Sequence, residues 1–495
     1  MTSNNDIISL FITGSKGGKD GGGGSTRIAQ EAPNTLQSKA SLRAIELIGE
    51  GEVSGLVDGA KSIFFDNTPL QNADGSYNFS GITFVERKGT PDQQVITGFS
   101  DVEEETPVGV KVTNPIPIVR SITDFDTDAL RVTIRIPALT EQNTSNGDLN
   151  GGQVSFKIEY QPNGGSYIAA IEDTITGKTV SPYEQAYRFN LTGSAPWNIR
   201  VTRISPDNEA ANIQNDIYWS SYTRIIDHKL IYPDSHIVGL EIDSSLFNNI
   251  PTRSYRVRGK IINVPSNYDP VTREYDGVWD GTFQLAYSNN PAWVLYDLII
   301  SERYGIGDLL IGMMPDKWMF YECGQYCDGM VDDGKGGLEP RFTFNGVLQA
   351  PEDAMRVLQT VASAMRAMVY WGVEGNSGVI TIAQDAPQDP VKLFTNANVM
   401  GGDFIYSGSS LDVRYTVCYV TYTDLNDPKR AAVEVVEDQA LIEKYGYRKN
   451  DVVAFGCTSR GQAKRAGLAN IFESCYATEI VNYAVGLADA DASPG

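Results

Sequence analysis

At 495 residues the chain is too long for a single hydrophobic core and should divide into roughly three or four domains. Apolar residues make up 41% of it, which suffices for globular cores and excludes wholesale disorder. The 40 basic residues face 62 acidic ones, and the net charge of −22 repels nucleic acid at long range. The composition therefore argues against specific nucleic-acid binding, and the abundant Tyr and Gly favour β structure.

The cysteine content and the apolar runs bear on the compartment. Five cysteines, an odd number without dense spacing, argue against a disulfide framework and favour reduced thiols in a cytoplasm. The apolar stretch 6–12 lacks a basic flank and is too short for a signal peptide. No apolar run approaches the ~20 residues that span a bilayer. The sequence therefore predicts neither an export signal nor a membrane-spanning segment.

The first 41 residues are expected to form a flexible, Gly-rich arm. The run Gly21–Ser25 would lose too much backbone entropy to fold alone. The stretch that ends in Gly18 and Lys19 superficially resembles a phosphate-binding loop. That frame begins with Thr13, where the motif needs Gly, and continues with Asp20, where it needs Ser or Thr. A phosphate loop is therefore rejected.

Two β-rich segments should follow the arm. Residues 42–125 are assigned to an N-terminal β domain, in which Ile63–Phe65 predicts a strand that runs into the turn Asp66–Pro69. Residues 126–215 alternate so cleanly between apolar and polar side chains that they predict an inserted β-sandwich, with a hairpin turn at Pro162–Gly165. The apolar positions of its strands are Val132, Ile134 and Ile136; Val154, Phe156, Ile158 and Tyr160; Tyr187, Phe189 and Leu191; and Trp197, Ile199 and Val201.

Helices are expected mainly in a central domain at 216–345 and an α+β domain at 346–495. Pro at the first turn predicts a helix over 291–304. A stripe at helical spacing predicts a second one with methionines as core filler; it comprises Ala354, Leu358, Val361, Met365 and Met368. A hairpin should follow, with its turn at 375–378. Ser459 and Gln462 predict a capping box that opens a last helix, whose buried face would contain Leu468, Ile471, Phe472 and Cys475.

Two groups of residues have the types that bind metals. Asp124, Asp126 and Asp128 are spaced as in a calcium loop, but Ala129 stands where the turn needs Gly and Arg135 where a bidentate Glu belongs. An acidic loop before a strand is the expected structure. Cys323 and Cys327 are four residues apart and could share one helical face. A zinc or iron–sulfur site needs about four ligands, so buried, unliganded thiols are expected instead.

Two further residue types could act on a substrate. His228 and His236 flank a turn at 232–233, where a single general base could lie, but no nucleophile pairs with them in a known order. Trp219, Trp279 and Trp293 could stack on sugars or partner chains, and a place in a hydrophobic core is equally compatible with each. No catalytic, cofactor-binding or metal-binding residue is therefore predicted, and neither enzymatic activity nor a cofactor is expected.

Six runs of residues resemble a known family. In chain order they are Trp219–Thr223, Val264–Tyr268, Val278–Phe283, Ala286–Asn290, Gly324–Asp328 and Ala454–Ala463. The chain resembles the N-terminal portion of the tail tip attachment (host specificity) proteins of lambda-type phages, from about residue 38 onward. The first dozen residues look like an extension of that pattern. The chain is also expected to stop inside a longer protein, because the family continues into further hub, fibronectin-like and receptor-binding domains.

The resemblance implies a mainly β, multidomain tail hub with α+β elements, built of β-barrel or β-sandwich domains and a few helices. Such hubs form ring-shaped homotrimers at the distal tip of a long, non-contractile tail, as components of the virion. The implied role is to close the tail tube, support receptor-binding domains, and take part in host attachment and DNA entry. The family is structural and this chain would carry no cofactor. The iron–sulfur cluster of such tips belongs to a neighbouring protein and is not transferred to Cys323 and Cys327.

The resemblance also implies partners. They are the distal tail ring protein, other tail tip proteins and the C-terminal end of the tape measure protein. A host outer-membrane receptor would be contacted through C-terminal domains that this chain lacks. Two other functions stay open: a tail-borne enzyme that degrades the cell envelope, for which an acidic pair in a groove is needed, and a carbohydrate-binding adhesin.

Overall fold

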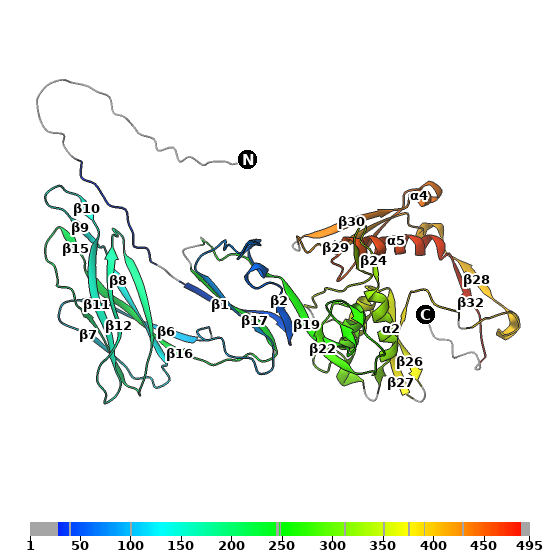
Figure 1. Cartoon of the computed structure of the whole chain (residues 1–495), viewed down its shortest axis with the longest axis horizontal. Helices are drawn as coiled ribbons and strands as arrows, with labels where there is room; N and C mark the ends of the chain where they lie inside the picture. Colours follow the sequence, from blue (N-terminus) through cyan, green and yellow to red (C-terminus); the bar gives the residue numbers. More distant parts are fainter. Residues whose placement is uncertain are drawn as a thin grey trace, which may run out of the picture.

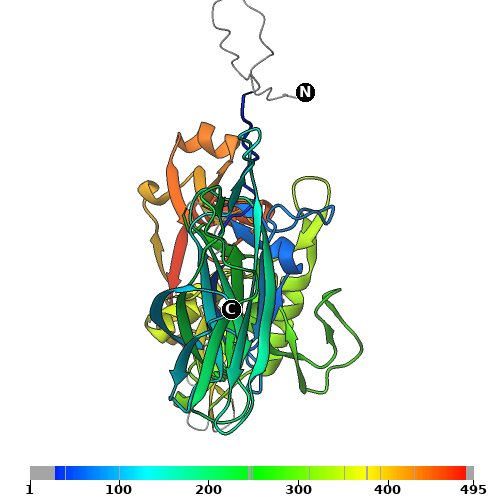
Figure 2. The same ribbon diagram turned by 90° about the vertical axis from the view of Figure 1, so that its left-hand side faces the viewer.

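The computed structural model of the chain describes residues 28–38, 41–99, 101–243, 247, 249–310, 313–349, 352–374, 377–390, 392–427 and 430–486. The Gly21–Ser25 run and the stretch that resembles a phosphate loop lie outside these residues. Three lobes follow one another along the long axis: a β-sandwich, a smaller β lobe in the middle, and a lobe that holds the five α-helices of the described residues (Figure 1). Figure 2 looks along this row from the sandwich end.

The sandwich consists of two antiparallel four-stranded sheets. One has the order β12 (Ile168–Gly177), β11 (Gly152–Gln161), β14 (Trp197–Arg203) and β7 (Ile118–Ile122). The other has the order β13 (Tyr183–Asn190), β8 (Ala129–Ile136), β16 (Ile217–Asp227) and β6 (Asp101–Val112). A small sheet of β9 (Thr140–Gln142), β10 (Leu149–Asn150) and β15 (Ile213–Gln214) lies at one end. The strands of the sandwich thus begin before residue 126 and end after residue 215. The domain boundaries that we expect from the sequence stay a prediction.

The core of the sandwich confirms the expected alternation. Val132, Ile134 and Ile136 of β8 are fully buried, as are Val154, Phe156 and Ile158 of β11. Their neighbours on the strands point away, because successive side chains of a strand alternate between the two faces of a sheet. Tyr187, Phe189 and Leu191 are only partly buried and pack against this core from its margin. The expected turn joins β11 and β12, and the Gly165 N–H donates to the Pro162 carbonyl at 2.9 Å.

The middle lobe is built from three three-stranded sheets. They contain β1 (Ser41–Glu50), β17 (Ser235–Asp243) and β5 (Ile82–Lys88); β18 (Arg253–Tyr255), β3 (Ile63–Phe65) and β4 (Thr68–Pro69); and β2 (Val53–Leu56), β19 (Val257–Pro265) and β22 (Phe283–Tyr287). The expected strand Ile63–Phe65 is confirmed, and Asp66 and Asn67 turn the chain with positive φ angles of 47° and 75°. One half of β19 pairs with β2 and the other half with β22. Ile262 and Val264 in the second half of β19 also belong to the hydrophobic core that contains Trp293 of α1, so this single strand ties the middle lobe to the next one.

Three helices and a mixed sheet form the next part of the chain. The helices are α1 (Pro291–Ile300), α2 (Lys317–Asp328) and α3 (Ala354–Ser363), and the sheet has the order β23 (Met314–Pro315), β27 (Ser377–Gln384), β26 (Ala367–Glu374). Helix α1 begins at Pro291 as expected but ends at Ile300, before residue 304. The backbone becomes extended at Ser301, and the Ile306 N–H then folds back to donate to the Leu298 carbonyl at 3.1 Å.

The methionine stripe is only partly helical. Leu358 and Val361 of α3 are buried, and so is Met365 in the turn that follows. Met368 lies in β26 and is 45% exposed, so its place in a helical stripe was wrong. The cause is Arg366, which has a positive φ of 56° and ends the helical geometry two residues earlier. The expected hairpin of β26 and β27 is confirmed by its pairs, although part of its turn lies outside the described residues.

The last part packs helix α5 (Arg460–Tyr476) on a sheet of order β30 (Ala431–Glu437), β29 (Val417–Thr423), β31 (Lys449–Val453), with α4 (Gln439–Tyr445) between two strands. Ile471 and Cys475 are buried and Leu468 is partly buried, but Phe472 is 41% exposed, which corrects its predicted burial. The minor elements are the strand pairs β20 (Tyr268–Asp269)–β21 (Glu274–Tyr275), β24 (Met330–Asp332)–β25 (Leu338–Pro340) and β28 (Ile405–Gly408)–β32 (Glu479–Asn482), and the 3-10 turns η1 (Gly59–Ser62), η3 (Gly307–Leu309), η4 (Met400–Gly402) and η5 (Leu411–Val413).

The chain is therefore mainly β with a few helices and several domains, as the sequence predicted. Within the described ranges, no helix is both long and apolar enough to cross a membrane.

Candidate functional site

A buried polar cluster lies where helices α1 and α2 meet, with Asp328, the last residue of α2, at its centre. The side chain of Asp328 is 2% exposed. Its Oδ1 accepts a hydrogen bond from Arg273 Nη1 at 2.7 Å, and its Oδ2 accepts from Asn290 Nδ2 at 2.7 Å and Tyr275 OH at 3.0 Å. Burial raises the pKa of the Asp328 carboxyl, and these three donors oppose that shift. Loss of any of these partners would leave a buried polar group unpaired, so the carboxylate fixes the position of α2 relative to the start of α1 and the hairpin of β20 and β21.

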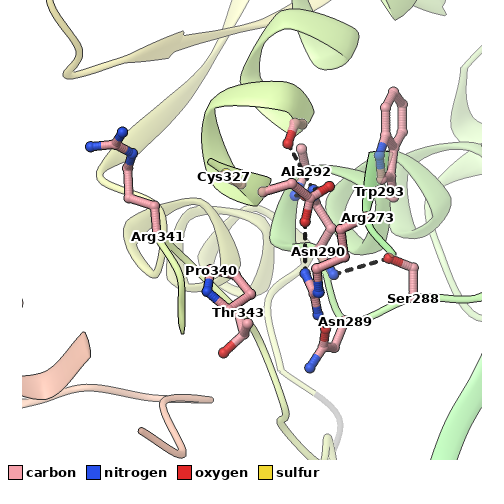
Figure 3. A network of polar contacts seen from close by, with 12 residues as sticks. Arg273, Ser288, Asn289, Asn290, Ala292, Trp293, Cys327, Pro340, Arg341 and Thr343 are labelled. Atoms are coloured by element: carbon pink, nitrogen blue, oxygen red, sulfur yellow. Dashed lines mark hydrogen bonds and ion pairs between the residues drawn. The ribbon is translucent and has the colours of Figure 1, made fainter. Parts of the chain in front are cut away.

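Asn290 connects the cluster to the first turn of α1. Its Oδ1 accepts from the Ala292 N–H at 2.9 Å and so caps the helix, while Pro291 fills the position that needs no backbone donor. The second N–H of its amide donates to the Gly324 carbonyl of α2 at 2.9 Å. Figure 3 shows Asn290 beside Arg273 and Asn289 below the start of the helix. One fully buried side chain thus caps α1 and fixes α2 against it.

An aromatic core surrounds the cluster. Tyr275 OH, besides donating to Asp328, accepts from the indole N–H of Trp293 at 3.1 Å. Trp279 stacks on Tyr321 with ring centroids 4.7 Å apart and meets the edge of Phe283 at 5.2 Å. Four of the six runs that resemble the phage family supply these residues or their direct neighbours. Runs far apart in the sequence are therefore close in space because they build one junction.

The cluster continues toward the sheet and helix of the last part of the chain. Asn289 Nδ2 donates to Asn345 Oδ1 at 3.2 Å, and Asn345 Nδ2 donates to Thr458 Oγ1 at 2.8 Å. Arg273 also donates to Asn289. This chain of side chains joins the hairpin of β20 and β21, the start of α1 and the segment before α5. These contacts fix the three segments relative to one another. We call this group of side chains the joint; it comprises Arg273, Asn289, Asn290, Asp328, Asn345 and Thr458.

Gln462 reinforces the same joint and corrects the predicted capping box. Ser459 caps α5 as expected, because its Oγ accepts from the Gln462 N–H at 3.3 Å. The Gln462 side chain does not return to the cap residue. Its Oε1 accepts from both the N–H and the hydroxyl of Thr343 at 3.1 Å, and its Nε2 donates to the Thr343 carbonyl at 3.0 Å. The amide thereby gives hydrogen-bond partners to the backbone of Thr343, a half-buried residue of this loop.

The acidic triplet forms structural contacts. Asp124 pairs with Arg224, and its Oδ1 accepts from the Asp126 N–H at 3.1 Å. Asp128 Oδ2 accepts from the Asp227 N–H at 2.9 Å and ties the loop to the end of β16. Across the residues that the structure covers, no group of three or more His, Cys, Asp or Glu side chains could hold a metal ion.

The cysteines and one of the two histidines are likewise engaged in packing. Cys323 and Cys327 are buried on α2, and Cys327 Sγ lies 3.8 Å from Met365 Sδ. Burial raises the pKa of Cys323 to about 12 and raises that of Cys327 as well, so both remain protonated hydrophobes. His236 is 1% exposed, with Nε2 2.9 Å from Glu86 Oε1, whereas His228 is exposed on the loop after β16.

The three tryptophans belong to hydrophobic cores. Trp219 and Trp293 are fully buried and Trp279 is 4% exposed. The indole N–H of Trp219 donates to the Ser221 carbonyl at 2.9 Å, and that of Trp279 donates to the Thr282 carbonyl at 2.6 Å. No face of these rings is offered to a sugar.

Residue patterns gave no role to Arg273, Asn290 and Asp328, although Asn290 and Asp328 end two of the runs that resemble the family. Asn290 carried a usable signal, because Asn before Pro at the start of a helix is a common cap. Arg273 and Asp328 are 55 positions apart and no local pattern links them. Only the fold shows that they form a pair.

Two family models match separate parts of the chain. "Tip attachment protein J, FNIII-A domain" covers residues 102–228, which is the sandwich, and "Putative phage tail protein" covers residues 353–495. Tip attachment protein J of Escherichia phage SECphi27 is 38% identical over 483 residues, which cover 97% of this chain and 40% of the relative. The protein of the same name in Escherichia phage SECphi4 is 38% identical over 460 residues, with 91% and 40% covered.

These matches, with the modular β architecture, define the chain as a phage tail protein. More specifically, it belongs to the family of tip attachment protein J, whose place in the virion is the tail tip. The chain spans about two fifths of the length of these relatives, since it covers 40% of each.

Solved structures show only remote likeness. The xylan-binding domain of a Paenibacillus barcinonensis xylanase is 7% identical with a TM-score of 0.15, over 39% of this chain and 99% of that one. The stem and receptor-binding domain of spike protein P1 from bacteriophage PM2 is 12% identical with a TM-score of 0.14, over 43% and 100%. Likeness of this degree supports no argument about this chain.

Proposed function

We propose that this chain forms the structural hub of the distal tip of a long, non-contractile phage tail. It assembles as a ring-shaped homotrimer that closes the tail tube, supports the receptor-binding domains of the whole protein, and takes part in host attachment and DNA entry. The observation that carries the proposal is the 38% identity to Tip attachment protein J over 97% of the chain. A match of that extent covers all three lobes rather than one exchangeable module.

The joint around Asp328 supports a mechanical role. The Asp328 carboxylate receives three donors and the amide of Asn290 uses both of its N–H groups, so neither is free to bind a ligand. Together with Gln462, these side chains fix α1, α2 and α5 relative to one another. A hub that carries load between the tail tube and the receptor-binding domains needs such rigid connections.

The proposed partners follow from this place in the tail. They are the distal tail ring protein, other tail tip proteins and the C-terminal end of the tape measure protein, with a host outer-membrane receptor contacted through further domains. The net charge of −22 suits a ring through which DNA passes, because walls of like charge do not retain it. A lumen lined mainly by Lys and Arg would contradict that assignment.

The two alternatives find less support. An envelope-degrading enzyme would need a pair of acidic side chains in a groove. A cavity of about 760 Å³ beside the joint is lined by such side chains, namely Asp269, Glu274, Asp276 and Asp328. Asp328 would have to break its three hydrogen bonds to act there. A carbohydrate-binding adhesin needs exposed aromatic platforms; Trp219, Trp279 and Trp293 are buried, while Trp318 and Trp371 are about half exposed and lie outside the runs that resemble the family.

Light scattering on the purified chain tests the proposal. A ring-shaped homotrimer should have about three times the monomer mass of 54.1 kDa. Electron microscopy of whole virions should place the chain at the threefold axis of the tail tip. A chain that stays monomeric at high concentration and is absent from the tip would refute the proposed hub.

A further inference from the structure

Residues 28–38 run along the β-sandwich, although they precede β1 of the middle lobe; we call them the strap (Figure 1). The strap crosses from one lobe to another. At its start, the Gln30 N–H donates to Asp148 Oδ1 at 2.8 Å and the Leu149 N–H donates to the Gln30 carbonyl at 2.9 Å. Further along, the N–H groups of Thr35 and Leu36 donate to the Lys178 carbonyl at 2.9 and 3.2 Å. The strap is therefore held by the sandwich much as an added strand would be.

The sandwich surface around Gly177 and Lys178 fits this segment closely, and we call this surface the groove. The Lys178 side chain is 2% exposed, and its Nζ donates to two strap residues, Glu31 Oε1 at 2.6 Å and Asn34 Oδ1 at 3.3 Å. A buried ammonium needs such partners, so the strap completes the site. Beside it, a Cβ on Gly177 would lie 2.7 Å from Thr35 Oγ1 and 2.8 Å from Leu36 Cγ. Only glycine leaves room for the strap there.

The strap has little structure of its own. Most of its residues are exposed, and only Ala32 and Leu36 are half-buried. Leu36 packs against the sandwich core, and the Glu184 N–H donates to Ser38 Oγ at 2.8 Å near the far end. The strap is therefore positioned by the groove and by no helix or sheet of its own. A strap with the same sequence from another molecule would find the same contacts.

We infer that in the ring the groove around Gly177 and Lys178 receives the strap of a second copy of this chain. This inference rests on the proposed homotrimer. A closed threefold ring needs two different, complementary surfaces on each subunit. Strap and groove are such a pair, and exchange between copies replaces each contact by an identical one. The exchange therefore adds a tie between subunits without requiring another complementary surface.

Charge also favours a tie of this kind. Each copy carries a net charge of −22, so neighbouring copies repel one another and exposed ion pairs between them are weakened by salt. In the ion pair of Lys178 with Glu31, the Lys178 side chain is 2% exposed but the Glu31 side chain is 60% exposed, so salt weakens this pair in part. Backbone hydrogen bonds along the strap are insensitive to the net charge. The backbone hydrogen bonds of the strap thus join like-charged subunits by contacts that repulsion and salt affect least.

Disulfide trapping in the full-length chain tests the exchange. A Cβ on Gly147 would lie 3.2 Å from the Ala29 Cβ, slightly closer than the separation of about 3.5–4.5 Å that a disulfide spans, and the φ of +77° at Gly147 makes a cysteine there strained. We would co-express Ala29→Cys and Gly147→Cys as separate chains with different tags, oxidise the assembly mildly, and separate it by non-reducing electrophoresis. The five native cysteines are buried and should not interfere. The matched control pairs Ala29→Cys with Ser166→Cys, an exposed position near the turn at the opposite end of β11 and β12.

A covalent heterodimer that forms with Gly147→Cys and not with Ser166→Cys is the expected result. The double variant Ala29→Cys/Gly147→Cys should then link chains into dimers and trimers. If it closes only within single chains, the exchange is refuted. Light scattering on the same samples tests the hub separately from the exchange. A trimer in which each strap stays on the sandwich of its own chain would support the proposed hub and contradict only the exchange.

Deletion of residues 1–38 gives a second measurement that does not depend on the cysteines. The truncated chain should lose at least tenfold in trimer affinity, and its circular dichroism spectrum should show that the sheets persist. A trimer of unchanged affinity would overturn the inference.

Discussion

Arg273 and Asp328 form an ion pair across 55 positions of sequence, with Arg273 Nη1 2.7 Å from Asp328 Oδ1. The two side chains come from different elements, since Arg273 precedes β21 and Asp328 ends α2. The carboxylate end of the pair is 2% exposed and the guanidinium end is 18% exposed. A pair that is buried to this extent destabilises the fold strongly once one partner is removed, because the remaining charge stays buried.

We therefore expect Asp328→Asn to destabilise the helical lobe by about 3–5 kcal/mol. The amide keeps the size of the side chain but removes the negative charge and brings an N–H group into a site that already holds three donors. Differential scanning calorimetry should show a lowered transition for this lobe and an unchanged one for the sandwich. The matched control is Asp276→Asn, an exposed position next to β21, in the same hairpin as Arg273. It should leave the transitions of both the helical lobe and the sandwich unchanged. Equal effects of the two variants would contradict the proposed role of the pair.

Gln462→Glu tests the contact between α5 and Thr343. The substitution keeps the shape of the side chain and removes the Nε2 donor that binds the Thr343 carbonyl at 3.0 Å, so two acceptors face each other. The expected loss is about 1–3 kcal/mol, as for a buried group left without its partner. Hydrogen exchange should report it as faster exchange of the Thr343 amide, because repulsion between the new carboxylate and the Thr343 carbonyl also moves the acceptor of this amide away. Gln439→Glu, at an exposed position of α4, is the control and should leave that amide protected.

Glu159 of β11 should make the sandwich sensitive to acid. Its carboxylate accepts from Arg200 Nε at 2.6 Å and from Arg200 Nη2 at 3.0 Å, and these bonds hold its pKa below the ordinary value near 4.5. A lowered pKa in the folded state adds stability above the ordinary value, and this stability is lost as pH falls through the folded value. The free energy of unfolding of the sandwich should therefore fall between about pH 5 and pH 3.

Glu159→Gln removes this dependence and should lower stability at pH 7 by about 1.5–3 kcal/mol, the contribution of hydrogen bonds to charged groups. Urea unfolding, followed by the fluorescence of the buried Trp197 and Trp219, measures both effects. Glu172→Gln, an exposed change on the neighbouring strand β12, should retain the pH slope of the parent. An unchanged slope in Glu159→Gln would show that the pair with Arg200 is not its source.

The sequence predicted the sandwich well because its information is local. Side chains of β8 and β11 alternate with a period of two, and burial on one face follows directly from that period. The predicted helix ends were less accurate. Nothing near Ile300 shows that the chain turns back at Ser301, because the turn depends on a contact between Ile306 and Leu298. Met368 was assigned to a helix for the same reason, since the positive φ of Arg366 interrupts a pattern that looks continuous.

The joint around Asp328 was beyond reach of local patterns for a different reason. Its members come from a hairpin, a helix cap and a helix end, and each looks ordinary in its own segment. Gln462 illustrates the difficulty, because Ser459 and Gln462 match a capping box while the Gln462 amide binds Thr343, 119 positions away. The family resemblance pointed to these segments without saying why they matter. The fold supplies the reason, which is that they pack against one another.

The five cysteines should be unreactive in the folded chain. All of them are buried, and burial raises the pKa of Cys457 to about 11 and of Cys323 to about 12. A thiol with a pKa near 11 has about a hundredfold less thiolate at pH 8 than one with a pKa near 9, and the thiolate is the reactive form. Labelling with Ellman's reagent at pH 8 should therefore modify none of them within minutes, and all five after unfolding in guanidinium chloride. Ser166→Cys, which adds an exposed thiol, should react at once and proves that the reagent is active. Rapid labelling of Cys323 or Cys327 in the folded chain would show an accessible pair and would reopen a metal-binding role for α2.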